Sequence, residues 1–117
     1  MPPNKVIEQV DAKRINAYSE EDKFRWISDV DGMIKKFILK EEVIEPYKFP
    51  EDGDRELLAP YPFDEMYGFY VEAMVDYYNR EYDYYNEVLT MFYTRFDEYR
   101  KAYIREHMPK SAGYFKM

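Results

Sequence analysis

The fold is decided by the stretch YVEAMVDYYNREYDYYNEVLTMFYTRFDEYRKAYIREH, residues 70–107, in which eleven of thirty-eight residues are Tyr or Phe. On a helical wheel, twelve apolar or aromatic residues in and just before this stretch share a sector about 100° wide, which is typical of a helical core stripe. They are Phe63, Tyr67, Tyr70, Met74, Tyr78, Tyr85, Val88, Leu89, Phe92, Phe96, Tyr99 and Tyr103. The stripe predicts helix throughout the segment, with one face packed against the protein.

A single helix over residues 64–107 conflicts with the position of Glu81. Glu81 falls close to the centre of the stripe, where burying an unpaired carboxylate costs several kcal/mol. Such a helix would also measure about 66 Å, whereas a domain of this size has a radius of gyration of about 13 Å. Both conflicts disappear if the chain turns near Asn79 and Arg80, because Asn is favoured at helix ends. We therefore predict a helical hairpin, about 64–79 and 81–107.

Two further helices are predicted before the hairpin. Val6, Ile7 and Val10 form the apolar stripe of a helix over about 4–13. Ser19 begins a capping box, SEED, whose acidic residues suit the first turn of a helix over about 20–39. The apolar face of this second helix consists of Phe24, Ile27, Val30, Ile34, Phe37 and Ile38, widened by Trp26 and Met33.

Residues 40–63 hold four of the seven prolines and are predicted as a long irregular loop. A short strand pair within EEVIEPYKF, residues 41–49, is left open. Asp64 is predicted as the N-cap of the third helix. Pro109 ends the last helix, and PKSAGYFKM, residues 109–117, is expected to be a flexible tail. The fold class is therefore all-α, a small four-helix domain spanning residues 1–117.

Composition and charge exclude several classes of function. The chain has 117 residues, of which 46% are hydrophobic and 35% charged, as expected for one folded domain. Its net charge of −7 argues against binding to a nucleic-acid backbone or to an anionic membrane. The absence of cysteine excludes disulfides and cysteine-based zinc sites. Without a long apolar run or a signal-peptide pattern, we expect a soluble cytoplasmic protein.

No motif predicts catalysis, a cofactor or a metal site. His107, the only histidine, is expected to cap carbonyls at a helix end. DVDG, residues 29–32, fails the calcium-loop register, because Ile34 and Lys40 occupy its sixth and twelfth positions. We interpret it as a solvated helix face, and EDGD, residues 51–54, as a turn. The protein is predicted not to be an enzyme.

Four tyrosines lie off the stripe: Tyr77, Tyr82, Tyr84 and Tyr93. Those that remain exposed would form an aromatic patch, which on a folded protein usually marks a protein interface. Stacking on nucleic-acid bases would require interleaved Arg and Lys, whereas this segment is acidic. We predict these four residues as interface candidates, together with Tyr114 and Phe115 in the tail.

Three segments resemble a known family. They are AYSEEDKFRWISDVDGMIKKFI (17–38), PEDGDRELLAPYPFDEMYGFYVEAMVDYYNREYDYYNEVLTMF (50–92) and REHMPK (105–110). Together they resemble the head–tail connector, or head-completion adaptor, proteins of tailed phages and prophages of Gram-positive bacteria, over about residues 5–110. Relatives often carry Gly where Arg80 stands, which agrees with a turn there.

The resemblance implies a mostly helical subunit that joins a ring of many copies beneath the portal of a DNA-filled head. Its expected partners are other copies of itself, the portal protein and the next connector or tail protein. A terminal segment commonly reaches into the portal in such adaptors. No catalytic residues are implied. The expected location is the virion, and the host cytoplasm during assembly.

Two other functions stay open. AMVDYYNREYDYYNEVL, residues 73–89, is similar to one tetratricopeptide hairpin, which favours a generic helical interaction module, although a solenoid needs about three repeats. The second is an acidic protein that mimics DNA. Such a protein needs acidic residues arrayed on one exposed face, whereas here basic residues are mixed with the acidic ones late in the chain.

Overall fold

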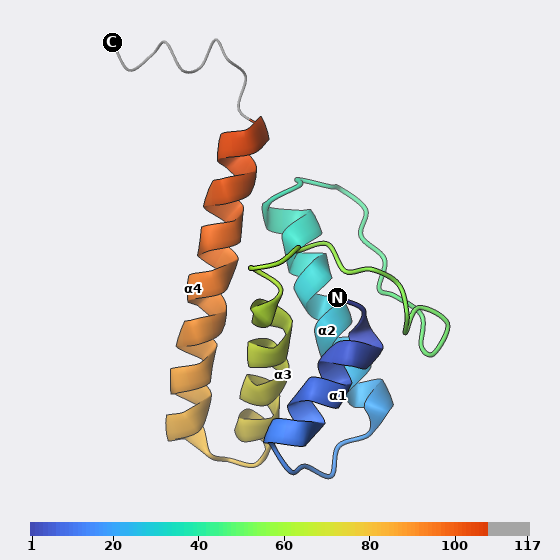
Figure 1. Ribbon diagram of the computed structural model, residues 1–117, viewed down its shortest axis with the longest axis vertical. Coiled ribbons are helices and arrows are strands. Elements are labelled where there is room, and N and C mark those ends of the chain that lie inside the picture. Colours follow the sequence, from blue (N-terminus) through green and yellow to red (C-terminus); the bar gives the residue numbers. More distant parts are fainter. Residues whose placement is uncertain (108–117) are drawn as a thin grey trace.

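The computed structural model describes residues 1–107, which fold into four α-helices (Figure 1). They are α1 (Pro3–Lys13), α2 (Glu20–Phe37), α3 (Glu65–Tyr78) and α4 (Tyr82–His107). The all-α class and the C-terminal hairpin are confirmed. The strand pair left open for residues 41–49 does not form, and the described range contains no strand. The tail predicted over 109–117 lies outside the described residues.

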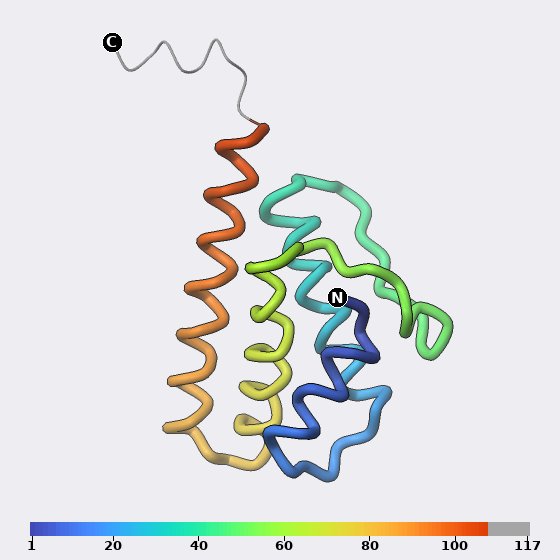
Figure 2. Tube along the Cα trace, viewed as in Figure 1, coloured from blue at the N-terminus to red at the C-terminus, as the bar shows by residue number. Residues whose placement is uncertain are grey.

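The hairpin turns where the sequence predicts. α3 ends at Tyr78, and the N–H of the next residue, Asn79, donates to the Val75 carbonyl at 2.9 Å. Arg80 then adopts φ 62°, and the Glu81 N–H donates to the Asp76 carbonyl at 2.8 Å. The reversal leaves Glu81 exposed rather than on a buried stripe. α3 and α4 consequently run antiparallel, side by side (Figures 1 and 2).

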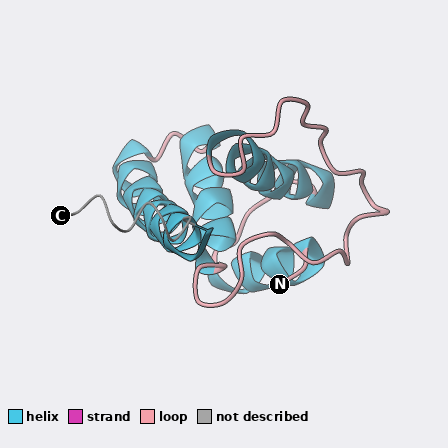
Figure 3. Cartoon of the chain, turned by 90° about the horizontal axis from the view of Figure 1, so that it is seen from above, coloured by secondary structure: helices cyan, strands magenta, loops and turns pink. Residues whose placement is uncertain are grey.

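α3 is the central helix of the bundle. It contacts α1, α2 and α4, whereas α4 contacts no other helix of the described chain than α3. Seen from above, α4 lies at one edge, and much of the connection between α2 and α3 runs around the opposite side (Figure 3). One long side of α4 is therefore left uncovered.

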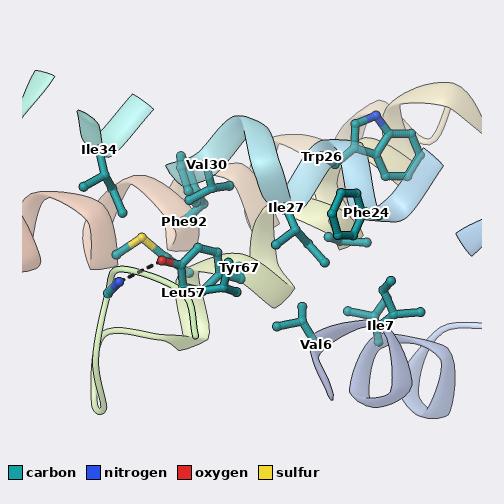
Figure 4. Close-up of a cluster of buried hydrophobic side chains, with 14 of the residues drawn as sticks. Val6, Ile7, Phe24, Trp26, Ile27, Val30, Ile34, Leu57, Tyr67 and Phe92 are labelled. Carbon is teal, nitrogen blue, oxygen red and sulfur yellow. Dashed lines mark hydrogen bonds between the residues drawn. The ribbon is translucent and has the colours of Figure 1, made fainter. Parts of the chain in front are cut away.

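The core forms where α1, α2 and α3 meet. Val6, Ile7 and Val10 are buried, as the first stripe predicts. The face predicted for α2 is buried at Phe24, Trp26, Ile27, Val30, Ile34 and Ile38. Figure 4 shows Tyr67 among buried side chains from α1, α2, α4 and the loop. The prediction is wrong for Phe37, which is 56% exposed because it lies in the last turn of α2, where the chain leaves the bundle.

The hairpin stripe is only partly buried. Three of its twelve residues, Tyr67, Phe92 and Tyr99, are buried, eight are half-buried and Tyr78 is 56% exposed. The reason is that α4 is covered on one side only, so its edges remain in contact with water. Conversely, Met66, Val71 and Val75 are not among the twelve residues of the predicted stripe and are fully buried, because α3 packs on three helices rather than one.

Asp31 is a buried carboxylate that joins three segments. Its Oδ1 accepts a hydrogen bond from the Tyr67 hydroxyl at 2.5 Å. Its Oδ2 accepts one from the Tyr47 hydroxyl at 2.7 Å and one from the Leu58 N–H at 3.1 Å. The interpretation of DVDG as a solvated face is therefore wrong at Asp31, which is 1% exposed, although Asp29 two residues earlier is exposed.

Burial governs the ionisation of this group. Loss of water raises the pKa of the Asp31 carboxyl above its ordinary value, although the hydrogen bonds from Tyr67, Tyr47 and Leu58 act in the opposite direction. Burial, together with the Asp31 charge, also raises the pKa values of the Tyr47 and Tyr67 hydroxyls. Both tyrosines therefore remain protonated donors over the physiological range of pH.

The loop over residues 40–63 is irregular, as predicted, but closely tied to the bundle. The Tyr47 N–H donates to Ser28 Oγ at 2.9 Å, and the Asn4 N–H donates to the Gly53 carbonyl at 2.9 Å. A Cβ atom on Gly53 would lie 2.7 Å from Nδ2 of Asn4, so a larger residue there would displace the Asn4 side chain, which donates to Oδ1 of Asp54. The loop thus forms one wall of the core.

The two predicted N-caps differ. Ser19 Oγ accepts a hydrogen bond from the Asp22 N–H at 3.1 Å, which confirms the cap on α2. Asp64 occupies the predicted N-cap position of α3, but its side chain makes no capping hydrogen bond. Asp64 already has helical backbone angles, φ −67° and ψ −10°, whereas a side-chain cap usually needs an extended residue.

The Asp31 network predicts a large loss of stability on truncation. Asp31→Ala should lower the free energy of unfolding by roughly 2–4 kcal/mol, because the Leu58 N–H and the Tyr67 hydroxyl lose their buried acceptor. Urea denaturation followed by circular dichroism measures this. Asp29→Ala, on the same helix but exposed, is the control and should change stability by no more than about 0.5 kcal/mol. Equal effects of the two substitutions would contradict the role of Asp31.

The turn predicts a gain of stability. Arg80→Gly should raise the free energy of unfolding by roughly 0.5–1 kcal/mol, since glycine adopts a positive φ without a Cβ clash. Arg80→Ala removes the same side chain but keeps the Cβ, so it should give no such gain. Thermal unfolding of both variants separates the backbone effect from the loss of charge. The same melting temperature in the two variants would exclude strain at this residue.

Candidate protein interface

The four off-stripe tyrosines are all exposed. Tyr77 is 45% exposed, Tyr82 53%, and Tyr84 and Tyr93 57% each. The structure brings Tyr77 and Tyr82 together, with ring centroids 6.1 Å apart. Tyr93, three turns further along α4, lies on the same side of that helix as Tyr82. Tyr84 lies on the opposite side, with the Arg14 guanidinium 5.9 Å from its ring centroid.

The two candidates from the tail, Tyr114 and Phe115, lie outside the described residues. Of the four others, only Tyr77 and Tyr82 share a contact, so the predicted set does not form one patch. It divides into a group at the hairpin turn and two separate positions on α4.

A larger aromatic group forms at the hairpin turn. Tyr77 contacts Tyr78 and Tyr85, each at a centroid distance of 5.2 Å. Tyr78 stacks on Trp26 at 5.8 Å with an interplanar angle of 12°, and Trp26 meets Tyr18 edge-on at 5.7 Å. We call this group the turn-end cluster; its members are Tyr18, Trp26, Tyr77, Tyr78, Tyr82 and Tyr85.

Four members of the turn-end cluster were missed as interface residues. Sequence reasoning assigned Trp26, Tyr78 and Tyr85 to the core and singled out no role for Tyr18. The cluster exists because the N-terminal end of α2 lies beside the C-terminal end of α3, at the same end of the bundle as the turn (Figure 1). That neighbourhood depends on how the helices pack, and no local pattern in the sequence indicates it.

Polar contacts fix the turn-end cluster in place. The Tyr18 hydroxyl donates to Oδ1 of Asn79 at 2.8 Å, which ties the segment before α2 to the turn. The Arg14 guanidinium forms an ion pair with the fully buried carboxylate of Asp76, joining the C-terminal ends of α1 and α3. No hydrogen bond of regular geometry reaches either oxygen of Asp76 within the described chain, so this ion pair is the compensation for burying its charge.

The junction between α1 and α2 is held in a similar way. Nζ of the buried Lys23 donates to Oδ1 of Asp11 at 2.7 Å and to Oδ1 of Asn16 at 3.1 Å. Burial would raise the pKa of the Asp11 carboxyl, but the hydrogen bonds from Lys23 and Asn16 outweigh it and lower that pKa. The segment that carries Tyr18 is therefore anchored at both of its ends.

A cleft of about 440 Å³ opens beside the stacked rings of Trp26 and Tyr78. Its lining consists of Tyr18, Asp22, Arg25, Trp26, Asp29 and Tyr78. Arg25 Nη2 lies 3.1 Å from Oδ1 of Asp22, so that carboxylate already has a cationic partner. The cleft combines aromatic faces with carboxylates, which is the chemistry that receives a cationic or aromatic side chain.

Charge is distributed unevenly along the bundle. The segments around the turn-end cluster, residues 19–29 and 76–87, hold eight acidic and three basic residues. Residues 100–117 hold five basic residues and one acidic residue. The acidic turn end is unsuited to phosphate, because nucleic-acid binding needs clustered Lys and Arg. It is suited to a basic protein segment.

The helix-end role predicted for His107 agrees with its contacts. Its Nδ1 lies 2.9 Å from the Tyr103 carbonyl oxygen, and its ring stacks on Tyr103 at a centroid distance of 3.9 Å. Among residues 1–107, no group of three or more His, Asp or Glu side chains is placed to hold a metal ion. In the same range, no helix is both long and apolar enough to cross a membrane.

The exposed tyrosines are predicted to contribute little to folding. Changing both Tyr82 and Tyr93 to Ser should alter the free energy of unfolding by no more than about 1 kcal/mol, because each side chain is more than half exposed. Tyr67→Phe is the matched comparison. It keeps the ring but removes the hydroxyl that bonds Asp31 and Ala59, and it should cost about 1–3 kcal/mol. A larger loss in the Tyr82 and Tyr93 double variant, measured by urea denaturation, would show that these residues belong to the core.

The chain matches no protein-family model, no curated protein and no solved structure. The geometry of the exposed aromatic surface and the sequence resemblance are therefore the basis on which a function is proposed.

Proposed function

We propose that this protein is a non-enzymatic structural subunit of tailed phages or prophages, a head–tail connector adaptor that forms a ring on the portal. The observation that carries the proposal is the open outer side of α4, where exposed apolar side chains lie along two separate edges. The sequence resemblance supplies the specific role, and the surface of α4 supplies a physical basis for assembly.

The two edges of α4 lie on nearly opposite sides of the helix. Tyr82, Tyr93 and Ile104 fall within about 40° of one another at 100° per residue, and their exposed fractions are 53%, 57% and 42%. Tyr84 and Met91, 57% and 47% exposed, lie about 180° away. The face that packs on α3 lies between these edges.

Two different edges suit a ring. In a closed ring each subunit contacts one neighbour with one surface and the other neighbour with a second, complementary surface. A subunit with a single patch would instead form a symmetric pair. Tyrosine and methionine are also among the residues enriched at protein interfaces. The arrangement therefore supports a subunit that joins neighbours on both sides.

The ring proposal is tested by incubating the purified protein with the portal protein of the same phage or prophage. We expect many copies per portal, seen as an added ring by electron microscopy and as added mass by mass photometry. Tyr93→Lys should abolish or strongly reduce the added ring, because it places an unpaired charge within one edge. Tyr93→Phe, which keeps the ring and loses only the hydroxyl, is the control and should assemble.

Failure of the unaltered protein to bind its portal would remove the connector role. If Tyr93→Lys and Tyr93→Phe assembled equally well, the edge formed by Tyr82, Tyr93 and Ile104 would not be a ring contact, and the proposed use of two edges would be contradicted. Binding to a different class of protein, without ring formation, would favour the generic interaction module.

A further inference from the structure

We propose that the cleft beside the turn-end cluster binds the C-terminal segment of a second copy of this chain, residues 108–117. This names a partner for the turn-end cluster and rests on the proposal that the protein is an assembly subunit. It concerns the end of the bundle, whereas the ring contacts concern the sides of α4.

The chemistry of the segment matches that of the cleft. MPKSAGYFKM contains two lysines, no acidic residue and the adjacent pair Tyr114 and Phe115. The cleft offers the rings of Trp26 and Tyr78, on which an aromatic ring or an ammonium group can stack. The Asp29 carboxylate at its rim is exposed, so that a lysine can reach it.

The segment of the same copy is too short to bring its aromatic pair to the stacked rings of Trp26 and Tyr78. α4 runs from Tyr82 beside the cluster to His107 at the far end of the bundle, a length of about 38 Å (Figure 1). Tyr114 follows His107 by seven residues, a reach of at most about 25 Å even if fully extended. A segment that stacks Tyr114 on these rings must therefore come from another copy.

The orientation of that second copy is also restricted. A copy that lies parallel to the first, as neighbours in a ring do, has its C-terminal segment at the wrong end. An antiparallel copy beside the first, or a copy placed end to end with it, brings the segment to the cleft. The antiparallel pair makes the contact twice and closes on itself, so we expect dimers of the unassembled protein rather than long chains.

Binding is measured with a synthetic peptide of residues 108–117 added to the full-length protein at a low concentration. Trp26, the only tryptophan, lines the cleft, so its fluorescence reports occupancy directly. We expect a saturable change. The control peptide, in which Glu replaces both Lys110 and Lys116, should bind about tenfold more weakly or not at all. Added salt should weaken the binding of the unaltered peptide.

A charge reversal in the protein tests the location. Asp29→Lys should weaken binding of the unaltered peptide by about tenfold and strengthen binding of the Glu peptide. In sedimentation velocity, Asp29→Lys alone and the double variant Lys110→Glu, Lys116→Glu alone should each dimerise less than the unaltered protein. A mixture of these two variants should recover dimers, because each contributes the complementary partner.

The inference is overturned if the peptide gives no saturable change, if both peptides bind equally, or if Asp29→Lys leaves binding unchanged. Portal binding is scored separately with the same Asp29→Lys protein, which keeps both edges of α4. If the unaltered protein forms rings but does not bind the peptide, the cleft contact is refuted and the connector role stays in place. If the unaltered protein binds the peptide but forms no ring on the portal, the cleft contact is supported and the connector role is refuted.

Discussion

The carboxylate of Asp31 is the interaction on which the rest of the structure depends. A charged group removed from water must regain its lost hydrogen bonds inside the protein, or the fold loses several kcal/mol. Asp31 regains them from Tyr67 on α3, from Tyr47 in the long loop, and from the N–H of Leu58 near the end of that loop. Because these donors come from α3 and from two separate positions in the loop, the carboxylate fixes the loop against both α2 and α3.

This arrangement places the core among α1, α2, α3 and the loop, and leaves α4 on the outside. The aromatic residues of α4 therefore divide into a face that packs on α3 and edges that remain in water. Tyrosine tolerates this division because its ring is apolar and its hydroxyl is hydrated. The exposed tyrosines are thus accessible to partners, which is what the proposed role as an assembly subunit requires.

The sequence predicts where each helix begins and ends better than it predicts which segments pack against it. Glu81 locates the turn because its carboxylate is incompatible with a continuous stripe, and Ser19 marks the start of α2 because its side chain bonds only local backbone. Asp31 could not be recognised, since its three donors lie 16 to 36 residues away along the chain.

The candidate interface was predictable to a similar extent. Helical periodicity separates Tyr77, Tyr82, Tyr84 and Tyr93 from the stripe, and all four are exposed. Periodicity assigns a residue to a face, but it does not say what covers that face. For that reason the stacking of Tyr78 on Trp26, and the cleft beside them, emerge only once α2 and α3 are placed side by side. Whether these residues bind a partner remains a prediction.

Amide hydrogen exchange, measured residue by residue, tests most directly whether Asp31 holds the loop in the core. The amides of Leu58 and Ala59, which donate to Asp31 and to the Tyr67 hydroxyl, should exchange only through openings nearly as costly as global unfolding. The exposed residues Glu42 and Glu45 in the same loop should exchange rapidly. Rapid exchange at Leu58 and Ala59 while α2 and α3 stay protected would show that the loop is not part of the core, and would contradict this account.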